Sequence, residues 1–288
     1  MMEIFLNLNW REKKMEMLLL FATASCTVLF CLGFGQAVFA QDEAELAKML
    51  SNPIANLISV PIQADYDENI GSGDEGSVWR INIQPVIPFT LNEEWNLISR
   101  TILPVIDQDN VPVMGMGESG IGDIVQSLFF SPQKPTSSGF IWGVGPVFLL
   151  PSASDNVLGG EKWGIGPTGV ALKQDGPWTY GALTNHIESV AGEDDRADIS
   201  LTLLQPFLTY RTKTMTTFVL EIGSTYDWEN EEWAVPINFS VQQMLKIGKL
   251  PLQVGAGVRY WADSPEYGAE DWGLRLQLTF LFPKIGGR

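Results

Sequence analysis

The residues best suited to chemistry in this chain are charged side chains within segments that alternate between polar and apolar residues. Seven of them would share one face of a sheet: Arg80, Arg100, Asp123, Asp198, Glu221, Arg259 and Arg275. Guanidinium groups bind carboxylates and other anions through several coplanar N–H donors. If the sheet closes on itself, the arginines come from neighbouring segments and the carboxylates from the other side. The pattern predicts a basic arc facing an acidic arc across a pore, with a structural network of paired charges as the alternative.

Histidine, the usual base of a hydrolase, occurs once in the chain, at His186. A hydrolase requires such a base close to a nucleophile. Glu188 would lie on the same strand face as His186, whereas Ser189 would lie on the opposite face. This spacing favours an ordinary strand residue. A membrane-embedded lipid hydrolase that uses His186 is the less favoured alternative, and we predict no catalytic residue.

Two further motifs match binding signatures only in part. Gly115-x-Gly117-x-x-Gly120 has the spacing of a dinucleotide fingerprint, but that fingerprint must lead into a helix and a strand follows here. Asp65-x-Asp67-x-Asn69 resembles the start of a calcium loop, but the loop's glycine is misplaced and its final glutamate is missing. No cluster has transition-metal spacing, so we predict no cofactor and no dedicated metal site.

The segments that carry these residues are joined by connections of two alternating kinds. Long acidic connections occupy residues 65–77, 107–121, 151–162, 189–197, 227–232 and 262–271. The short connections are basic and contain Lys134, Lys173, Arg211, Lys213, Lys246 and Lys249. Outer-membrane barrels have long outer loops and short periplasmic turns. The alternation predicts an all-β, transmembrane, up-and-down antiparallel β-barrel of about 12 strands in residues 54–288.

The strands show the period of two that a sheet with two different faces requires. In the second strand, for example, Trp79 and Ile81 alternate with Arg80 and Asn82. Nine of the ten tryptophans follow residue 40, and most of these are predicted at strand ends. Such placement is typical of the aromatic girdles at the two membrane interfaces.

The N-terminal region has the features of a secretory signal peptide in residues 1–40. Three basic residues precede an apolar stretch over 17–35, and Ala-Val-Phe-Ala at residues 37–40 offers a cleavage site. A transmembrane anchor, or a lipid anchor at Cys26, is the alternative. Cys26 and Cys31 both lie in this region, which excludes disulfides from the mature chain. Residues 41–53 have helical composition and are predicted as a plug or a periplasmic tail ahead of one barrel domain.

The charge of the chain excludes one class of partner and supports another. Residues 1–40 carry three bases and three acids, so the net charge of −16 stays with the mature chain. Such a charge repels nucleic acid phosphates. A secreted chain without an apolar helix can span a membrane only as a closed barrel. We therefore predict the outer membrane of a Gram-negative bacterium, with lipid and lipopolysaccharide as partners and divalent cations held loosely by the acidic outer loops.

Several stretches resemble a known family: residues 51–62, 119–124, 159–167 and 185–187. Together they are similar to bacterial outer-membrane proteins classed as transporters and related to those found with meta-pathway phenol degradation. The similarity covers nearly the whole mature chain. It implies a barrel fold and the uptake of small aromatic or other hydrophobic compounds. These stretches carry no defined chemistry, so the resemblance transfers no site residue, and no residue here supports phenol in particular.

The leading hypothesis is an outer-membrane channel for the passive uptake of small solutes. The inward arginines would then favour anionic or polarised aromatic solutes. One alternative is a closed, plugged barrel that serves structure or adhesion through its acidic outer loops. The other is the lipid hydrolase considered above. A soluble carrier barrel is disfavoured because its apolar faces would point inward, which leaves the aromatic girdles unexplained.

Overall fold

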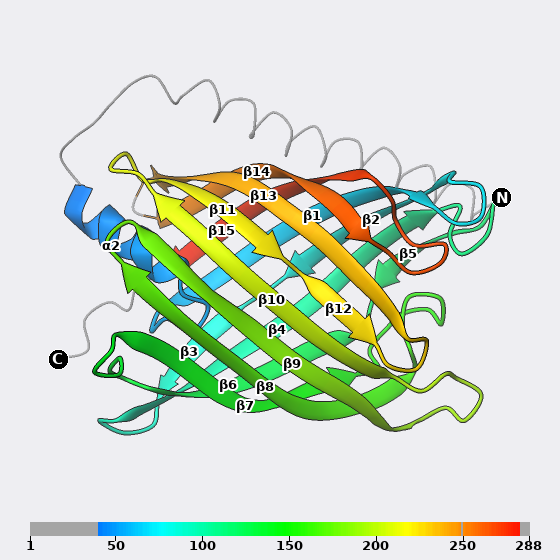
Figure 1. Ribbon diagram of the computed structural model, residues 1–288, viewed down its shortest axis with the longest axis horizontal. Coiled ribbons are helices and arrows are strands. Elements are labelled where there is room, and N and C mark those ends of the chain that lie inside the picture. Colours follow the sequence, from blue (N-terminus) through cyan, green and yellow to red (C-terminus); the bar gives the residue numbers. More distant parts are fainter. Residues whose placement is uncertain (1–39, 249, 283–288) are drawn as a thin grey trace. The chain divides into compact units, whose positions relative to one another are not determined.

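The structure is a computed structural model that describes residues 40–248 and 250–282 (Figure 1). The predicted signal peptide lies outside the described residues except for Ala40, as do Lys249 and residues 283–288. Both cysteines also lie outside them.

The described residues form one short helix and a single large antiparallel sheet. The helix is α2 (Ala40–Leu50). The strands are β1 (Ile58–Ile70), β2 (Gly76–Ile83), β3 (Val86–Thr90), β4 (Trp95–Asp109), β5 (Gly117–Ile121), β6 (Ile124–Pro132), β7 (Phe140–Leu150), β8 (Lys162–Asp175), β9 (Trp178–Gly192), β10 (Ser200–Arg211), β11 (Thr216–Ile222), β12 (Ser224–Asp227), β13 (Glu232–Ile247), β14 (Leu250–Asp263) and β15 (Trp272–Phe282). No helix in these ranges has the length and apolarity needed to cross a bilayer.

The sheet closes on itself as a barrel of twelve strands. Each strand pairs with its sequence neighbours, β1 pairs with β15, and the pairing of β9 with β10 completes the ring. Three wall strands are each interrupted once, as β2 and β3, β5 and β6, and β11 and β12, so fifteen segments minus three give twelve strands. Closure removes the unpaired edges that lipid cannot satisfy. The predicted architecture is confirmed.

The registers assign each residue to one face of the wall. Asp65 stands opposite Arg80 on one side and opposite Arg275 on the other, so all three side chains share a face. On each strand, the residues adjacent in sequence to these three point to the other face, where Leu274, the neighbour of Arg275, is 52% exposed. Leu204 and Phe239 are exposed in the same way. A polar interior and an apolar exterior are the arrangement of a barrel that faces lipid.

Aromatic side chains gather near both ends of the strands. Near the long loops, Tyr66 contacts Trp79 and Tyr260 contacts Trp272, each with ring centroids 5.0 Å apart. Near the short turns, the Trp178 and Tyr210 rings are 4.7 Å apart. These are the two girdles expected where the wall crosses the membrane interfaces.

One expectation about the loops needs correction. The first long loop was expected to start at residue 65, but β1 continues to Ile70, and Asp65 and Asp67 are both 2% exposed. These carboxylates remain in the ladder because charged partners on neighbouring strands hold them. They therefore belong to the interior and not to an outer calcium-binding loop. Gly115, by contrast, lies in a loop at a φ of 81°, and strand β5 follows, as expected.

The N-terminal segment packs at the end of the barrel that carries the short turns. Ala47 of α2 joins Leu57, Met244 and Leu281 in one apolar cluster. The Gln174 side chain also donates a hydrogen bond of 2.8 Å to the Lys48 carbonyl. The helix ends ahead of Asn52-Pro53, because a residue before proline is disfavoured in helical conformation.

The two faces of β10 provide a test of the wall's orientation. Leu204→Arg puts a charge on the lipid side and should lower the free energy of unfolding in lipid vesicles by about 2–4 kcal/mol. The matched variant Gln205→Arg puts the same side chain in the interior, where Gln205 lines a cavity. Its effect, measured by denaturant titration, should be much smaller. Equal losses for the two variants would contradict the assignment of faces.

Candidate functional site

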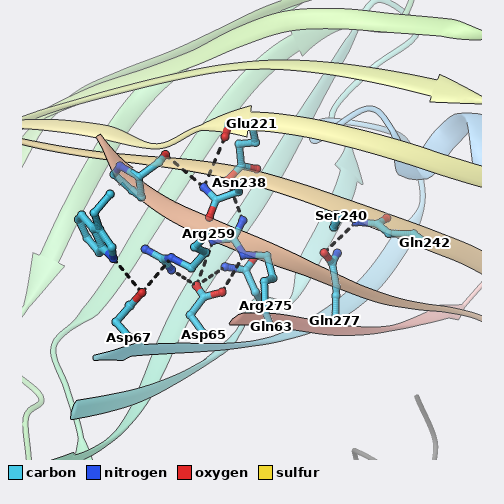
Figure 2. A network of polar contacts seen from close by, with 12 residues as sticks. Gln63, Asp65, Asp67, Glu221, Asn238, Ser240, Gln242, Arg259, Arg275 and Gln277 are labelled. Carbon is cyan, nitrogen blue, oxygen red and sulfur yellow. Dashed lines mark hydrogen bonds and ion pairs between the residues drawn. The ribbon is translucent and has the colours of Figure 1, made fainter. Parts of the chain in front are cut away.

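The interior contains a buried group of charges, which we name the arginine–carboxylate cluster. Figure 2 shows it, and its members are Asp65, Asp67, Glu221, Arg259 and Arg275. Three neighbouring strands, β1, β14 and β15, supply four of the residues. Glu221 comes from β11, which is not adjacent to them. The cluster therefore connects parts of the wall that do not share backbone hydrogen bonds.

Asp65 is the centre of this cluster. Its Oδ1 accepts from Arg275 Nε at 2.7 Å, and its Oδ2 accepts from Arg275 Nη2 at 3.0 Å. Arg259 Nη1 lies 2.6 Å from the same Oδ2. Gln63 Nε2 adds a hydrogen bond of 2.8 Å. A carboxylate that receives a bidentate arginine and further donors is held firmly, since charge-assisted bonds are among the strongest hydrogen bonds in proteins.

The remaining members extend the cluster in two directions. Asp67 Oδ1 accepts from Trp261 Nε1 at 2.9 Å and lies 3.2 Å from Arg259 Nε. The Arg259 guanidinium also lies over the Trp261 ring, 5.1 Å from its centroid. Toward the other side of the barrel, Arg275 Nη1 donates to Glu221 Oε1 at 3.1 Å. Buried charges need such partners to offset their lost hydration, so the cluster also stabilises the barrel.

The structure brings together only some of the seven residues predicted for the lumen. Arg259, Arg275 and Glu221 meet in the cluster. Arg80 lies beside them on β2, opposite Asp65 in the register. Arg100 lies apart and lines a cavity, where its Nη2 donates to Gln84 Oε1 at 2.8 Å.

Asp123 lies at the interruption between β5 and β6, and Asp198 lies in the loop before β10, so neither joins the cluster. Asp123 follows β5 and accepts hydrogen bonds from the backbone N–H groups of Ser152, Ala153 and Gly160, at 3.0, 3.1 and 2.7 Å. It thereby fixes the loop over residues 151–161. Asp198 pairs with Lys162 at 3.2 Å, and its side chain is 70% exposed. The roles of both residues are set by these loop contacts.

These contacts do not form the predicted basic arc facing an acidic arc. Asp65 and Asp67 stand on the basic side and pair with its arginines. They were missed as interior residues because their segment was assigned to a polar outer loop. The period-two pattern of Gln63, Asp65 and Asp67 could have revealed them, since all three share a strand face.

A cavity of about 340 Å³ occupies the interior next to the cluster. Amide and hydroxyl side chains form much of its wall, including Asn82, Gln84, Gln205, Asn238, Gln242, Gln253, Gln277, Thr209, Thr217 and Thr279. Apolar residues contribute a second part, including Val86, Ile102, Leu183, Leu203 and Phe207. Residues 49–53, which end and follow α2, line it from the N-terminal segment. Such a wall can hydrogen-bond a polar group and enclose an apolar one.

His186 has partners of its own away from this cavity. Its Nδ1 lies 2.9 Å from Thr202 Oγ1, and its Nε2 lies 3.3 Å from Glu188 Oε2. Trp228 Nε1 also donates to Thr202 Oγ1, at 2.8 Å. Ser189, the serine considered as a nucleophile, instead donates to Asp198 at 3.3 Å. In the described part of the chain, His186 thus contacts a threonine already engaged by a tryptophan, and it has no serine partner.

The described residues contain no group of three or more histidine, cysteine, aspartate or glutamate side chains that could hold a metal ion. The carboxylates with the deepest burial, Asp65 and Asp67, are already occupied by arginines. The chemistry of the interior is therefore that of hydrogen bonding and charge.

Comparison with known proteins supports the fold. No protein-family model matches the chain, and no curated protein sequence matches it. Among solved structures, the chain is similar to the COG4313 outer membrane channel from Pseudomonas putida F1, with 13% identity and a TM-score of 0.62 over 79% of this chain and 96% of that one. It also matches the Salmonella typhi outer membrane phospholipase (OMPLA) dimer with bound calcium, with 10% identity and a TM-score of 0.44 over 86% and 99% of the two chains. The second similarity is too low to support an argument.

The fold, the apolar outer face and the two girdles agree with one another. An exposed apolar band between aromatic rings is stable in a bilayer and not in water. The chain thus has the fold of an outer-membrane β-barrel, and the apolar outer face of its wall is suited to lipid.

The central carboxylate of the cluster can be tested for its role in stability. Asp65→Asn leaves Arg259 and Arg275 without the charge they share, so the free energy of unfolding should fall by roughly 3–5 kcal/mol. The control is Glu68→Gln on the same strand, because Glu68 is exposed and makes only a 3.4 Å contact from the Tyr66 hydroxyl. Denaturant titration in lipid vesicles measures both. Equal stabilities for the two variants would contradict the account of the cluster.

Proposed function

We propose that the protein is a channel for the passive uptake of small solutes through the outer membrane, without a cofactor. The observation that carries the proposal is a polar cavity inside a closed barrel whose interior charges are not balanced. Among the described residues around the cavity and the cluster, four arginines (Arg80, Arg100, Arg259 and Arg275) and three carboxylates (Asp65, Asp67 and Glu221) give 4 − 3 = +1. Closer to the outer loops, the buried Lys162 and the part-buried Asp123 add one charge of each sign. The whole chain, in contrast, carries −16.

The size of the barrel supports a selective channel. A barrel's diameter grows with its strand number, and twelve strands enclose less space than the 16–18 strands of general porins. Side chains from the wall also extend into this lumen, because Arg275 of β15 contacts Glu221 of β11 although β13 and β14 lie between these two strands. A solute must therefore pass close to hydrogen-bonding and charged groups. An excess positive charge along that path favours anions.

The solutes proposed here are small aromatic or other hydrophobic compounds, in particular those with an anionic or polarised group. The resemblance to outer-membrane proteins associated with phenol degradation supports the aromatic part. The apolar side of the cavity, with Leu183, Leu203 and Phe207, supports it as well. The arginines support the anionic part. The similarity to the Pseudomonas putida channel is consistent with passage through the barrel.

The acidic outer loops suggest how the protein contacts lipopolysaccharide. The loop after β9 contains Glu193, Asp194 and Asp195, all of them exposed. Divalent cations could bridge such carboxylates to the anionic groups of lipopolysaccharide, which would hold the barrel among its lipid neighbours. We propose lipopolysaccharide as a partner on this basis.

A second candidate function is a plugged barrel that serves structure or adhesion. The observation that favours it is the N-terminal segment, which lines the cavity with residues 49–53 and is anchored by Ala47 and by the Gln174 bond to Lys48. If this segment never moves, solutes cannot pass. The two candidates differ in the conductance of the intact protein.

Ion selectivity tests the role of the interior charges. The double variant Arg80→Gln, Arg100→Gln removes two positive charges that have no carboxylate within ion-pair distance in the described residues. Reversal potentials in planar bilayers should shift toward cation selectivity. The control, Lys134→Gln with Lys213→Gln, removes two exposed positive charges from the short turns. Unchanged selectivity in the first variant would contradict the proposed path.

Removal of the N-terminal segment separates the two candidate functions. We expect the intact protein to conduct in small steps, and we expect deletion of residues 41–53 to enlarge them, because that segment lines the cavity. Single-channel recordings measure both proteins. Conductance that appears only after the deletion would favour the plugged barrel. A deletion with unchanged steps would show that the segment does not narrow the path.

A further inference from the structure

We propose that Arg100 binds the carboxylate group of a small organic acid whose apolar body lies against the opposite wall of the cavity. The inference rests on the proposed channel function and names the class of solute and its point of attachment. It concerns the cavity next to the arginine–carboxylate cluster, and the described residues alone carry it.

The first support is the pairing of the interior arginines. Arg259 and Arg275 each contact carboxylates of the cluster. Arg100 has no carboxylate within ion-pair distance among residues 40–248 and 250–282, and its hydrogen bond goes to the neutral Gln84 amide. A guanidinium has five N–H donors. Gln84 therefore orients the group, and Glu221, which lines the same cavity, attracts its charge from beyond ion-pair distance.

The second support is the wall around Arg100. Arg100 stands opposite Val86 in the register of β3 and β4, and Ile102 follows on the same face. Leu183, Leu203 and Phe207, from β9 and β10, also line the cavity. Leu183 belongs to a core cluster against which Leu203 and Phe207 pack. The cavity thus has a cationic point and an apolar wall within one space.

The volume of the cavity agrees with a small solute. It measures about 340 Å³, close to the lower end of the 300–1,000 Å³ found for small-molecule pockets. Such pockets are usually apolar with a few placed polar groups that fix the orientation of the ligand. Arg100 and the Gln84 amide that it contacts provide those groups here.

The chemistry of the site favours a carboxylate over other groups. A guanidinium binds a carboxylate through two parallel N–H···O bonds, which gives both strength and direction. A cation would be repelled by Arg100. A neutral molecule would leave the guanidinium charge without a carboxylate in direct contact, because Glu221 acts on it only from beyond ion-pair distance. A channel also requires binding that is weak enough to allow release, and one arginine with one carboxylate suits that requirement.

The test uses the full mature protein in detergent, with benzoate, benzamide and acetate as probes in isothermal titration. Benzoate has the carboxylate and the apolar body, benzamide lacks the charge, and acetate lacks the body. We expect benzoate to bind at least about tenfold more tightly than benzamide, since hydrogen bonds to a charged partner are stronger than neutral ones. Arg100→Gln should abolish this preference. Arg80→Gln, which also removes an interior arginine, should retain it.

A second variant keeps the proposal testable if Arg100→Gln does not fold, which gel mobility before and after heating would reveal. Phe207→Ala removes part of the apolar wall, so it should weaken benzoate binding several-fold and leave acetate binding unchanged. Benzoate that binds no better than benzamide to the wild type would overturn the proposal. So would equal benzoate affinities for wild type and Arg100→Gln, or for wild type and Phe207→Ala.

The failure of this inference can be distinguished from failure of the channel function. Binding in detergent does not require transport, whereas bilayer conductance does not require a carboxylate site. A conducting protein without benzoate preference would overturn the Arg100 site and leave the channel standing. A protein that prefers benzoate but never conducts, even after deletion of residues 41–53, would overturn the channel.

Discussion

Lipid offers no hydrogen-bonding partner to a polypeptide, and this constraint determines the rest of the structure. Every backbone N–H and C=O in the bilayer must pair within the protein, so the sheet has to close through the contact of β9 with β10. Closure separates an outer face from an inner one. The outer face takes apolar residues such as Leu274, and the inner face takes the groups that lipid would reject. Within the wall, polar residues are therefore concentrated on the inner face.

The interior contains two kinds of charged residue, those paired with an opposite charge and those without such a contact. A charge deprived of water needs a partner, and Arg275 finds two, Asp65 and Glu221, on strands that are not joined to each other. Such pairs join strands of the wall that share no backbone hydrogen bonds. Arg100 is oriented by an amide and, in the described residues, has no carboxylate within ion-pair distance, although Glu221 attracts it from farther away. An interior that contains both kinds can be rigid around the cluster and still attract an anion next to it.

The fold could be predicted from sequence because its signals are local. The period of two and the alternation of long and short connections are read within about ten residues, and they led to the correct barrel. Asp65 and Asp67 were misplaced because an inward polar residue at the end of a strand looks the same as a loop residue. Their pairing depends on partners as far as 210 positions away, as for Arg275 and Asp65. The partners of Asp123 are equally hard to predict, since they come from a distant loop that folds back.

The claim on which the account depends is that alternate residues of one strand face lipid and the interior. The cysteines of the chain lie within residues 1–40, so single cysteines can be introduced along β13 from Asn238 to Val241 and given a fluorescent or spin label. In bilayers, labels at Phe239 and Val241 should respond to a lipid-soluble quencher, and labels at Asn238 and Ser240 to a water-soluble one. Equal access to the water-soluble quencher at all four positions would contradict the account.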